Sequence, residues 1–115
     1  MAKVSEMHTF ELKPLMDETT FEEFVVTELC PIYRRVPGQT AQLLKGDRGE
    51  RAGKYLILVE VESVERRDQI YPPGAEDGYP EEIQALLGNV DATWDRFFTF
   101  VEPDTAYTSY VMLGD

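Results

Sequence analysis

The sequence predicts an α+β domain in which a four-stranded antiparallel sheet carries its helices on one face. Three observations lead to this prediction. A dense apolar run at residues 54–62 has the length and side-chain types of a central strand. An amphipathic stripe with three- and four-residue spacing follows Asp17. Strand and helix patterns then follow one another in the order strand, helix, strand, strand, helix, strand.

The first two elements lie before residue 37. Residues 8–13 alternate apolar and polar side chains, which is typical of a half-buried strand, and Pro14 ends the pattern. Residues 17–36 form a helical region with one apolar stripe. Pro31 lies inside this stripe and lacks a backbone donor, so we expect either a kink or a restart of the helix there.

Two strands form the centre of the chain. Residues 40–45 and 54–62 are expected to pair as an antiparallel hairpin, joined by a charged loop at residues 46–53. This loop contains three glycines but lacks the Gly-Lys-Ser/Thr ending of a phosphate-binding loop. We therefore interpret it as a hairpin tip.

The second half begins with a short helix at residues 63–71. Prolines and glycines at 72–80 interrupt the helical pattern, and Pro80, at a first helical position, starts a further helix that runs through Leu87. Another helical turn then carries Trp94, and residues 106–113 alternate as the last strand.

Composition excludes several classes of function. The formal charge of −11 disfavours binding to nucleic acid or to anionic lipid, because both reward clustered cations. The chain contains no apolar run of membrane-spanning length and no signal-peptide pattern, so we expect no membrane partner and a cytoplasmic location. The single cysteine, Cys30, rules out an internal disulfide and a multi-cysteine metal site. We expect neither a metal nor a cofactor.

This element order is the split βαβ pattern of a ferredoxin-like fold, with the first and third strands adjacent at the centre of the sheet. The whole chain, residues 1–115, resembles the dimeric α+β barrel superfamily and is expected to form one domain. The resemblance depends on the element order, the hairpin at 40–62, and the segments 94–98 and 107–113. It implies a homodimer in which two sheets pack face to face. It also implies kinship with small antibiotic-biosynthesis-type monooxygenases, isomerases and uncharacterised members, so it is specific for fold and weak for function.

Some members of this superfamily degrade haem with an asparagine, a tryptophan and a histidine. This chain has Asn89 and Trp94, but its one histidine, His8, falls on the first expected strand and not on the second helix. We therefore expect no haem.

Strand alternation divides the candidate site residues between the two faces of the sheet. Helix packing is expected to cover Phe10, Leu12, Tyr55, Ile57, Val59 and Val61. The opposite face then carries Leu56, Leu58, Glu11 and Glu60 toward the interior of the dimer barrel. Tyr107 or Tyr110 joins them, depending on register.

Two partly buried carboxylates close together are a usual setting for a general base, so Glu11 and Glu60 are candidate catalytic residues. Alternatively, these carboxylates reach the rim or pair with Lys13, Arg48 or Arg51.

His8 is a candidate base near neutral pH or, alternatively, a structural residue. Trp94 is a candidate wall of an aromatic ligand pocket or, at helical spacing, a core residue.

Two hypotheses for function remain. In one, the chain is a cofactor-free monooxygenase or isomerase that binds a small hydrophobic or aromatic molecule, with Leu56, Leu58, Trp94, Tyr107 and Tyr110 contacting the substrate. In the other, it is a noncatalytic homodimeric binding or assembly module. The loop at 72–80, flanked by Tyr71 and Tyr79, is either a surface excursion or a lid.

Overall fold

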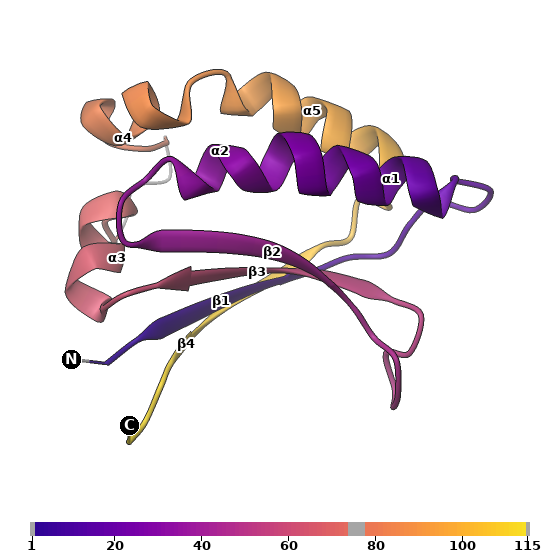
Figure 1. Ribbon diagram of the computed structural model, residues 1–115, viewed down its shortest axis with the longest axis horizontal. Helices are drawn as coiled ribbons and strands as arrows, with labels where there is room; N and C mark the ends of the chain where they lie inside the picture. Colours follow the sequence, from indigo (N-terminus) through magenta and orange to yellow (C-terminus); the bar gives the residue numbers. More distant parts are fainter. Residues whose placement is uncertain (1, 74–77, 115) are drawn as a thin grey trace.

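A computed structural model describes residues 2–73 and 78–114 and shows a sheet with helices on one face (Figure 1). The strands are β1 (Val4–Thr9), β2 (Gln39–Lys45), β3 (Tyr55–Val61) and β4 (Ala106–Val111). The helical segments are α1 (Glu18–Phe24), the π-helical turn η1 (Val25–Leu29), α2 (Cys30–Arg34), α3 (Val64–Ile70), α4 (Glu81–Leu87) and α5 (Val90–Phe100).

The sheet has four strands in the order β2-β3-β1-β4, and every neighbouring pair is antiparallel. β1 and β3 therefore occupy the centre, as the element order predicted. The prediction of a ferredoxin-like α+β fold with a four-stranded sheet and helices on one face is confirmed.

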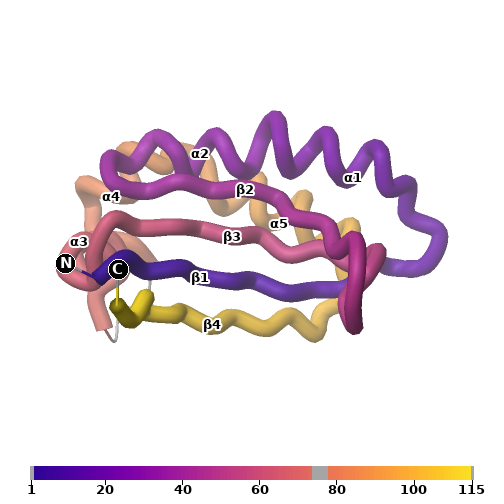
Figure 2. Tube along the Cα trace, turned by 60° about the horizontal axis from the view of Figure 1, so that its bottom comes forward, coloured from indigo at the N-terminus to yellow at the C-terminus, as the bar shows by residue number. Residues whose placement is uncertain are grey.

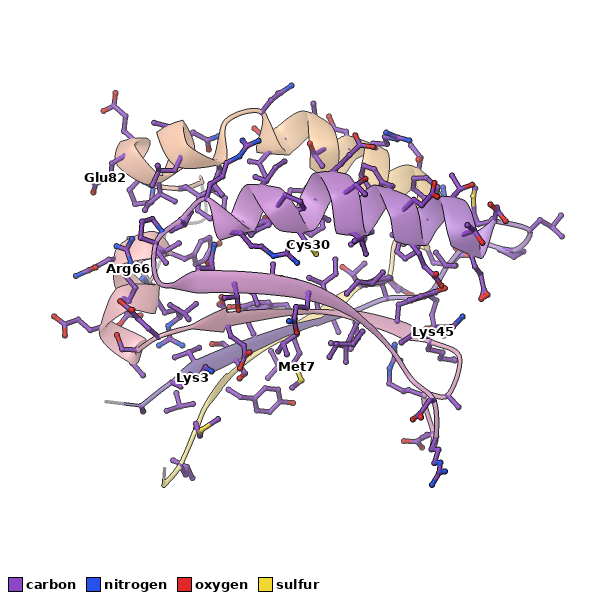
Figure 3. The ribbon with its side chains drawn as sticks, viewed as in Figure 1. Lys3, Met7, Cys30, Lys45, Arg66 and Glu82 are labelled. Carbon is purple, nitrogen blue, oxygen red and sulfur yellow. The ribbon has the colours of Figure 1, made fainter. Side chains whose placement is uncertain are left out.

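The first strand was placed too late in the chain. β1 covers Val4–Thr9, whereas the strand was expected at residues 8–13. The apolar and polar alternation did not indicate the correct start of the strand, because β1 directs the polar side chains of Glu6 and His8 toward the helices. Met7 lies on the outer face of the sheet (Figure 3). A strand whose inward positions line a cavity does not show the usual apolar alternation.

The interruption expected at Pro31 takes the form of a π-helical turn. The backbone N–H of Cys30 donates to the carbonyl of Val25, five residues earlier, and Pro31 follows directly. Because Pro31 has no N–H to donate to the carbonyl four residues back, the turn before it widens. α1, η1 and α2 nevertheless form one continuous helical rod along the sheet (Figure 1).

The helix-facing side of the sheet carries the core. Tyr55, Ile57, Val59 and Val61 are all buried there, as strand alternation predicted. Cys30 points from the helical rod toward the sheet and is 1% exposed (Figure 3). The outer face of the sheet is not covered by any described element, and Figure 2 shows the strands in front of the helices.

Candidate functional site

A cavity of about 260 Å³ lies between the sheet and the helices. The sheet contributes Glu6, His8, Gln39, Val59 and Tyr107. The helices and the chain that follows α3 contribute Tyr33, Ile70, Tyr71, Tyr79 and Trp94. This cavity combines mostly aromatic walls with a few polar groups, which is the usual composition of a small-molecule site.

One wall of the cavity is a hydrogen-bonded cluster of three aromatic side chains. The indole Nε1–H of Trp94 donates to the hydroxyl oxygen of Tyr33 at 2.5 Å. That hydroxyl lies 3.3 Å from the hydroxyl of Tyr79. Burial raises the pKa of Tyr33 and of Tyr79, and the charge of Glu6 adds to both effects. Both phenols therefore stay protonated at neutral pH.

His8 lies on the floor of the cavity. Its ring is 4.9 Å from the Tyr107 ring and 6.3 Å from the Trp94 ring, measured between centroids. Burial lowers the pKa of His8, so the imidazole is neutral at neutral pH. No residue within 2–73 and 78–114 hydrogen-bonds the ring, so its basic nitrogen is free to accept a proton.

Glu6 lies two residues before His8 and on the same face of β1. Its Oε2 accepts a hydrogen bond from the hydroxyl of Tyr107, which lies opposite His8 in the register. Burial, followed by this bond to the Glu6 carboxylate, raises the pKa of Tyr107 to about 12. Tyr107 is therefore a donor to Glu6 at neutral pH and not a base.

A second cavity of about 210 Å³ adjoins the first on the other side of His8 and Trp94. Its remaining walls are Phe10, Phe97, Phe98 and Thr105. The two cavities therefore share the imidazole and the indole.

The structure does not bring Glu11 and Glu60 together. Glu60 lies opposite Ser5 near the start of β1, whereas Glu11 lies beyond the other end of that strand. The expected juxtaposition was wrong because β1 lies earlier in the chain than the alternation suggested. Glu60 pairs with Lys3 at 3.3 Å. Glu11 pairs with Lys54 and lies 3.8 Å from Arg51, one of the three partners named in the alternative prediction.

Either Tyr107 or Tyr110 was expected on the outer face, depending on register, and the register places Tyr110 there. Tyr107 is opposite His8 and lines the cavity, while Tyr110 is opposite Ser5 on the outer face. Leu56 and Leu58 also lie on the outer face, next to Thr9 and Met7. Of the expected site residues, three line the same cavity: His8, Trp94 and Tyr107.

Sequence reasoning missed Glu6, Tyr33 and Tyr79. The polar residues Glu6 and His8 recur with the two-residue period of a strand, and this spacing was the available signal. Tyr33 lies on α2, which follows the widened turn before Pro31, and Tyr79 lies in the chain after α3. Their meeting depends on tertiary packing, which no local pattern shows.

The expectation for residues 72–80 falls partly on residues 74–77, which lie outside the described residues. The flanking aromatic residues are described. Tyr71 and Tyr79 pack edge to face with ring centroids 5.8 Å apart, and both line the larger cavity.

Among residues 2–73 and 78–114, no group of three or more His, Cys, Asp or Glu side chains is placed to hold a metal ion. None of the helices in that part of the chain has the length and apolar character needed to cross a membrane.

Comparison with known proteins identifies the fold. No protein-family model matches the chain, and no curated protein sequence does so. Among solved structures, the chain is similar to SnoaB, a cofactor-independent oxygenase from Streptomyces nogalater. The TM-score is 0.62, and the two sequences are 11% identical over 98% of this chain and 95% of that one. It is also similar to a dabb family protein with a ferredoxin-like fold from Mesorhizobium loti, with a TM-score of 0.55 and 15% identity over 99% of this chain and 100% of that one.

A third similar structure is a dimeric ferredoxin-like protein of unknown function from Thermobifida fusca, with a TM-score of 0.58 and 10% identity over 96% of this chain and 92% of that one. The expected resemblance to dimeric ferredoxin-like proteins is therefore confirmed at the level of fold. At these identities the similarity extends no further.

Proposed function

We propose that the chain is a cofactor-free enzyme that binds a small aromatic ketone in the larger cavity and removes a proton from it with His8. The observation that carries this proposal is a neutral imidazole without a hydrogen-bond partner among the described residues, on the floor of an aromatic-walled cavity. A general base needs a free, unprotonated nitrogen within reach of the substrate. The His8 nitrogen is unprotonated and accepts no hydrogen bond from the described residues, and the imidazole lines the cavity in which the substrate would bind.

The fate of the resulting carbanion defines the reaction. In the oxygenase case, the carbanion of a substrate R₂CH₂ transfers an electron to dioxygen, the two radicals join, and the peroxide anion takes the proton back from His8. Loss of water from R₂CH–OOH breaks the O–O bond and gives R₂C=O, so one O₂ is consumed and one H₂O released. The similarity to SnoaB, a cofactor-independent oxygenase, supports this case over others.

Anthrone, whose methylene group is acidified by an aryl ketone, is a suitable substrate for the test. We expect the wild-type protein to consume one O₂ for each anthraquinone formed, measured with an oxygen electrode and by absorbance. His8→Gln removes the base and should lower the rate about 100-fold or more. Tyr110→Phe, on the outer face, is the control and should leave the rate unchanged.

An isomerase would use the same base but would return the proton to another carbon without oxygen. Proton exchange from a deuterated ketone under anaerobic conditions, with no oxygen uptake in air, would favour isomerisation. If the protein accelerates neither process, the enzyme proposal is wrong and a noncatalytic binding module becomes the better account.

We also propose that the outer face of the sheet packs against a second copy of the chain. Leu44, Tyr110 and Met112 are 39%, 52% and 47% exposed on or beside this face, and Leu56 and Leu58 lie between them. An uncovered apolar sheet face normally marks an interface, and a face that meets its own copy closes the assembly. The similar ferredoxin-like protein from Thermobifida fusca is described as dimeric.

Sedimentation tests this interface. We expect a dimer for the wild-type protein at micromolar concentration and a monomer for Leu58→Glu, because the new charge would be buried at the centre of the contact. Glu65→Lys, on the exposed side of α3, is a control that also changes charge. A wild-type monomer would overturn the proposal.

A further inference from the structure

The aromatic cluster in the larger cavity has one more hydrogen-bond donor than it can satisfy. Trp94, Tyr33 and Tyr79 supply three donor protons, and two hydrogen bonds join them. If Tyr33 donates to Tyr79, the proton of Tyr79 is left over. If Tyr79 donates to Tyr33, the proton of Tyr33 is left over. In both arrangements one phenolic O–H has no acceptor among residues 2–73 and 78–114, and both phenols line the cavity.

The floor of the cavity has the opposite character. Glu6 uses Oε2 to accept from Tyr107, and no described residue donates to its Oε1. His8 adds an unprotonated nitrogen. The larger cavity therefore has a donor on the wall that carries Tyr33 and Tyr79 and acceptors on β1.

We infer that the Tyr33–Tyr79 pair binds the carbonyl oxygen of the ligand and so fixes its orientation, with the acidic hydrogen directed toward Glu6 and His8. This inference rests on the proposed function, and it assigns to the pair a role that the proposal does not need. A phenol that is already aimed at the carbonyl oxygen stabilises the negative charge that develops there when His8 removes the proton. Trp94 acts through Tyr33, because its N–H occupies one acceptor site of the Tyr33 oxygen.

The chain carries its own reporter for a binding test. Trp94 is the only tryptophan, and its indole lines the cavity, so quenching of its fluorescence measures occupancy. Three neutral bicyclic probes test the carbonyl and the acidic hydrogen of the ligand separately. The first, 6-hydroxy-1-tetralone, has a carbonyl and a hydroxyl. The second, 1-tetralone, lacks the hydroxyl, and the third, 5,6,7,8-tetrahydro-2-naphthol, lacks the carbonyl. We expect the first probe to bind about tenfold more tightly than either of the others, since each lost hydrogen bond leaves a polar group of the site unpaired.

Variants of the tyrosine pair test the role of the leftover proton. Tyr33→Phe/Tyr79→Phe removes both phenolic protons and keeps both rings, and it should abolish the tenfold preference for 6-hydroxy-1-tetralone over the naphthol. Each single Tyr→Phe replacement leaves one phenolic proton in the cavity, so it should reduce this preference less than the double replacement does. Tyr110→Phe removes a phenol from the outer face and should preserve the preference in full.

A vibrational measurement covers the case in which the double variant does not fold. In the wild-type complex with ¹³C-carbonyl-labelled 6-hydroxy-1-tetralone, the carbonyl stretch should lie at lower frequency than in an aprotic solvent. An unshifted stretch, equal affinity for the three probes, or no quenching by any probe at millimolar concentration would each overturn the inference.

Because these are binding measurements, failure of anthrone oxidation with the probe preference intact would contradict the proposed function alone. Oxidation without the preference would contradict the inference alone.

Discussion

The two ends of the layer between the helices and the sheet contain similar numbers of aromatic rings but use them differently. At the α1 end, Phe10, Phe21 and Phe100 pack edge to face, with Phe21 at 5.7 Å from Phe10 and 5.6 Å from Phe100 between ring centroids. At the α2 end, Tyr33 and Trp94 meet at 6.2 Å, but their polar atoms bond to each other and a cavity remains beside them.

The difference shows what a hydroxyl or an indole N–H changes in otherwise similar packing. A phenylalanine ring can be surrounded by carbon on all sides, because it has no polar atom that needs a partner. A buried tyrosine or tryptophan needs a partner for its polar atom, and three such residues with one proton left over hold open a polar space. The boundary lies within α5, where Trp94 contacts Phe97 with ring centroids 4.9 Å apart.

The largest expected effect is on the phenylalanine end. Phe21 is completely buried, and Phe21→Ala should lower the free energy of unfolding by about 3–5 kcal/mol through lost burial and the cavity left behind. Phe98→Ala is the matched control, because Phe98 is 46% exposed on α5 and should cost far less. Urea unfolding monitored by circular dichroism gives both values. Equal losses for the two variants would contradict the division of the layer into a packed end and an open end.

The sequence predicted the packed end and the sheet more accurately than the open end. The run at 54–62 and the stripe with Phe21 and Phe24 follow the periods of a strand and a helix, and burial enforces those periods. The open end breaks them. Glu6 and His8 occupy inward positions of β1 that line a cavity, so the alternation of a half-buried strand was recognised only from residue 8 onward.

The site itself could be predicted only residue by residue. His8, Trp94 and Tyr107 were expected from their chemistry, but nothing local placed them in one cavity on the helix side of the sheet. The site was expected on the outer face, where Leu56, Leu58, Glu60 and Tyr110 lie. The reason is that the resemblance implies a dimer whose barrel interior is formed by that face. Tyr33 and Tyr79 are 46 residues apart in the chain, so their contact follows from tertiary structure alone.

A smaller effect is expected from pH at the open end. Burial lowers the pKa of His8 in the folded protein, so between the ordinary histidine value of about 6.5 and the folded value the unfolded chain binds more protons. The contribution of His8 to stability is therefore fully present above about pH 6.5 and declines as the pH falls toward the folded pKa. Urea unfolding of the wild type and His8→Gln between pH 8 and pH 5 measures this difference.

For the same reason, the acid limb of anthrone oxidation should have a midpoint below about 6.5, since His8 stays unprotonated to lower pH than a free histidine. A midpoint above that value, or a wild-type stability that rises relative to His8→Gln as the pH falls, would show that His8 is not buried as the cavity requires.

The smallest effect is expected at Glu11, which the sequence placed among the candidate catalytic residues. Its carboxylate lies beyond the end of β1, outside the aromatic-walled cavity that contains His8, and contacts Lys54 and Arg51 with side chains that are 48% and 40% exposed. Exposed ion pairs contribute about 0–1 kcal/mol, because solvent screens the charges and the side chains lose freedom. Glu11→Gln should therefore lower the free energy of unfolding by no more than about 1 kcal/mol and leave the rate of anthrone oxidation unchanged. A loss of rate comparable to that of His8→Gln, at full stability, would move the reacting centre away from the aromatic cavity and toward the end of the sheet where Glu11 lies.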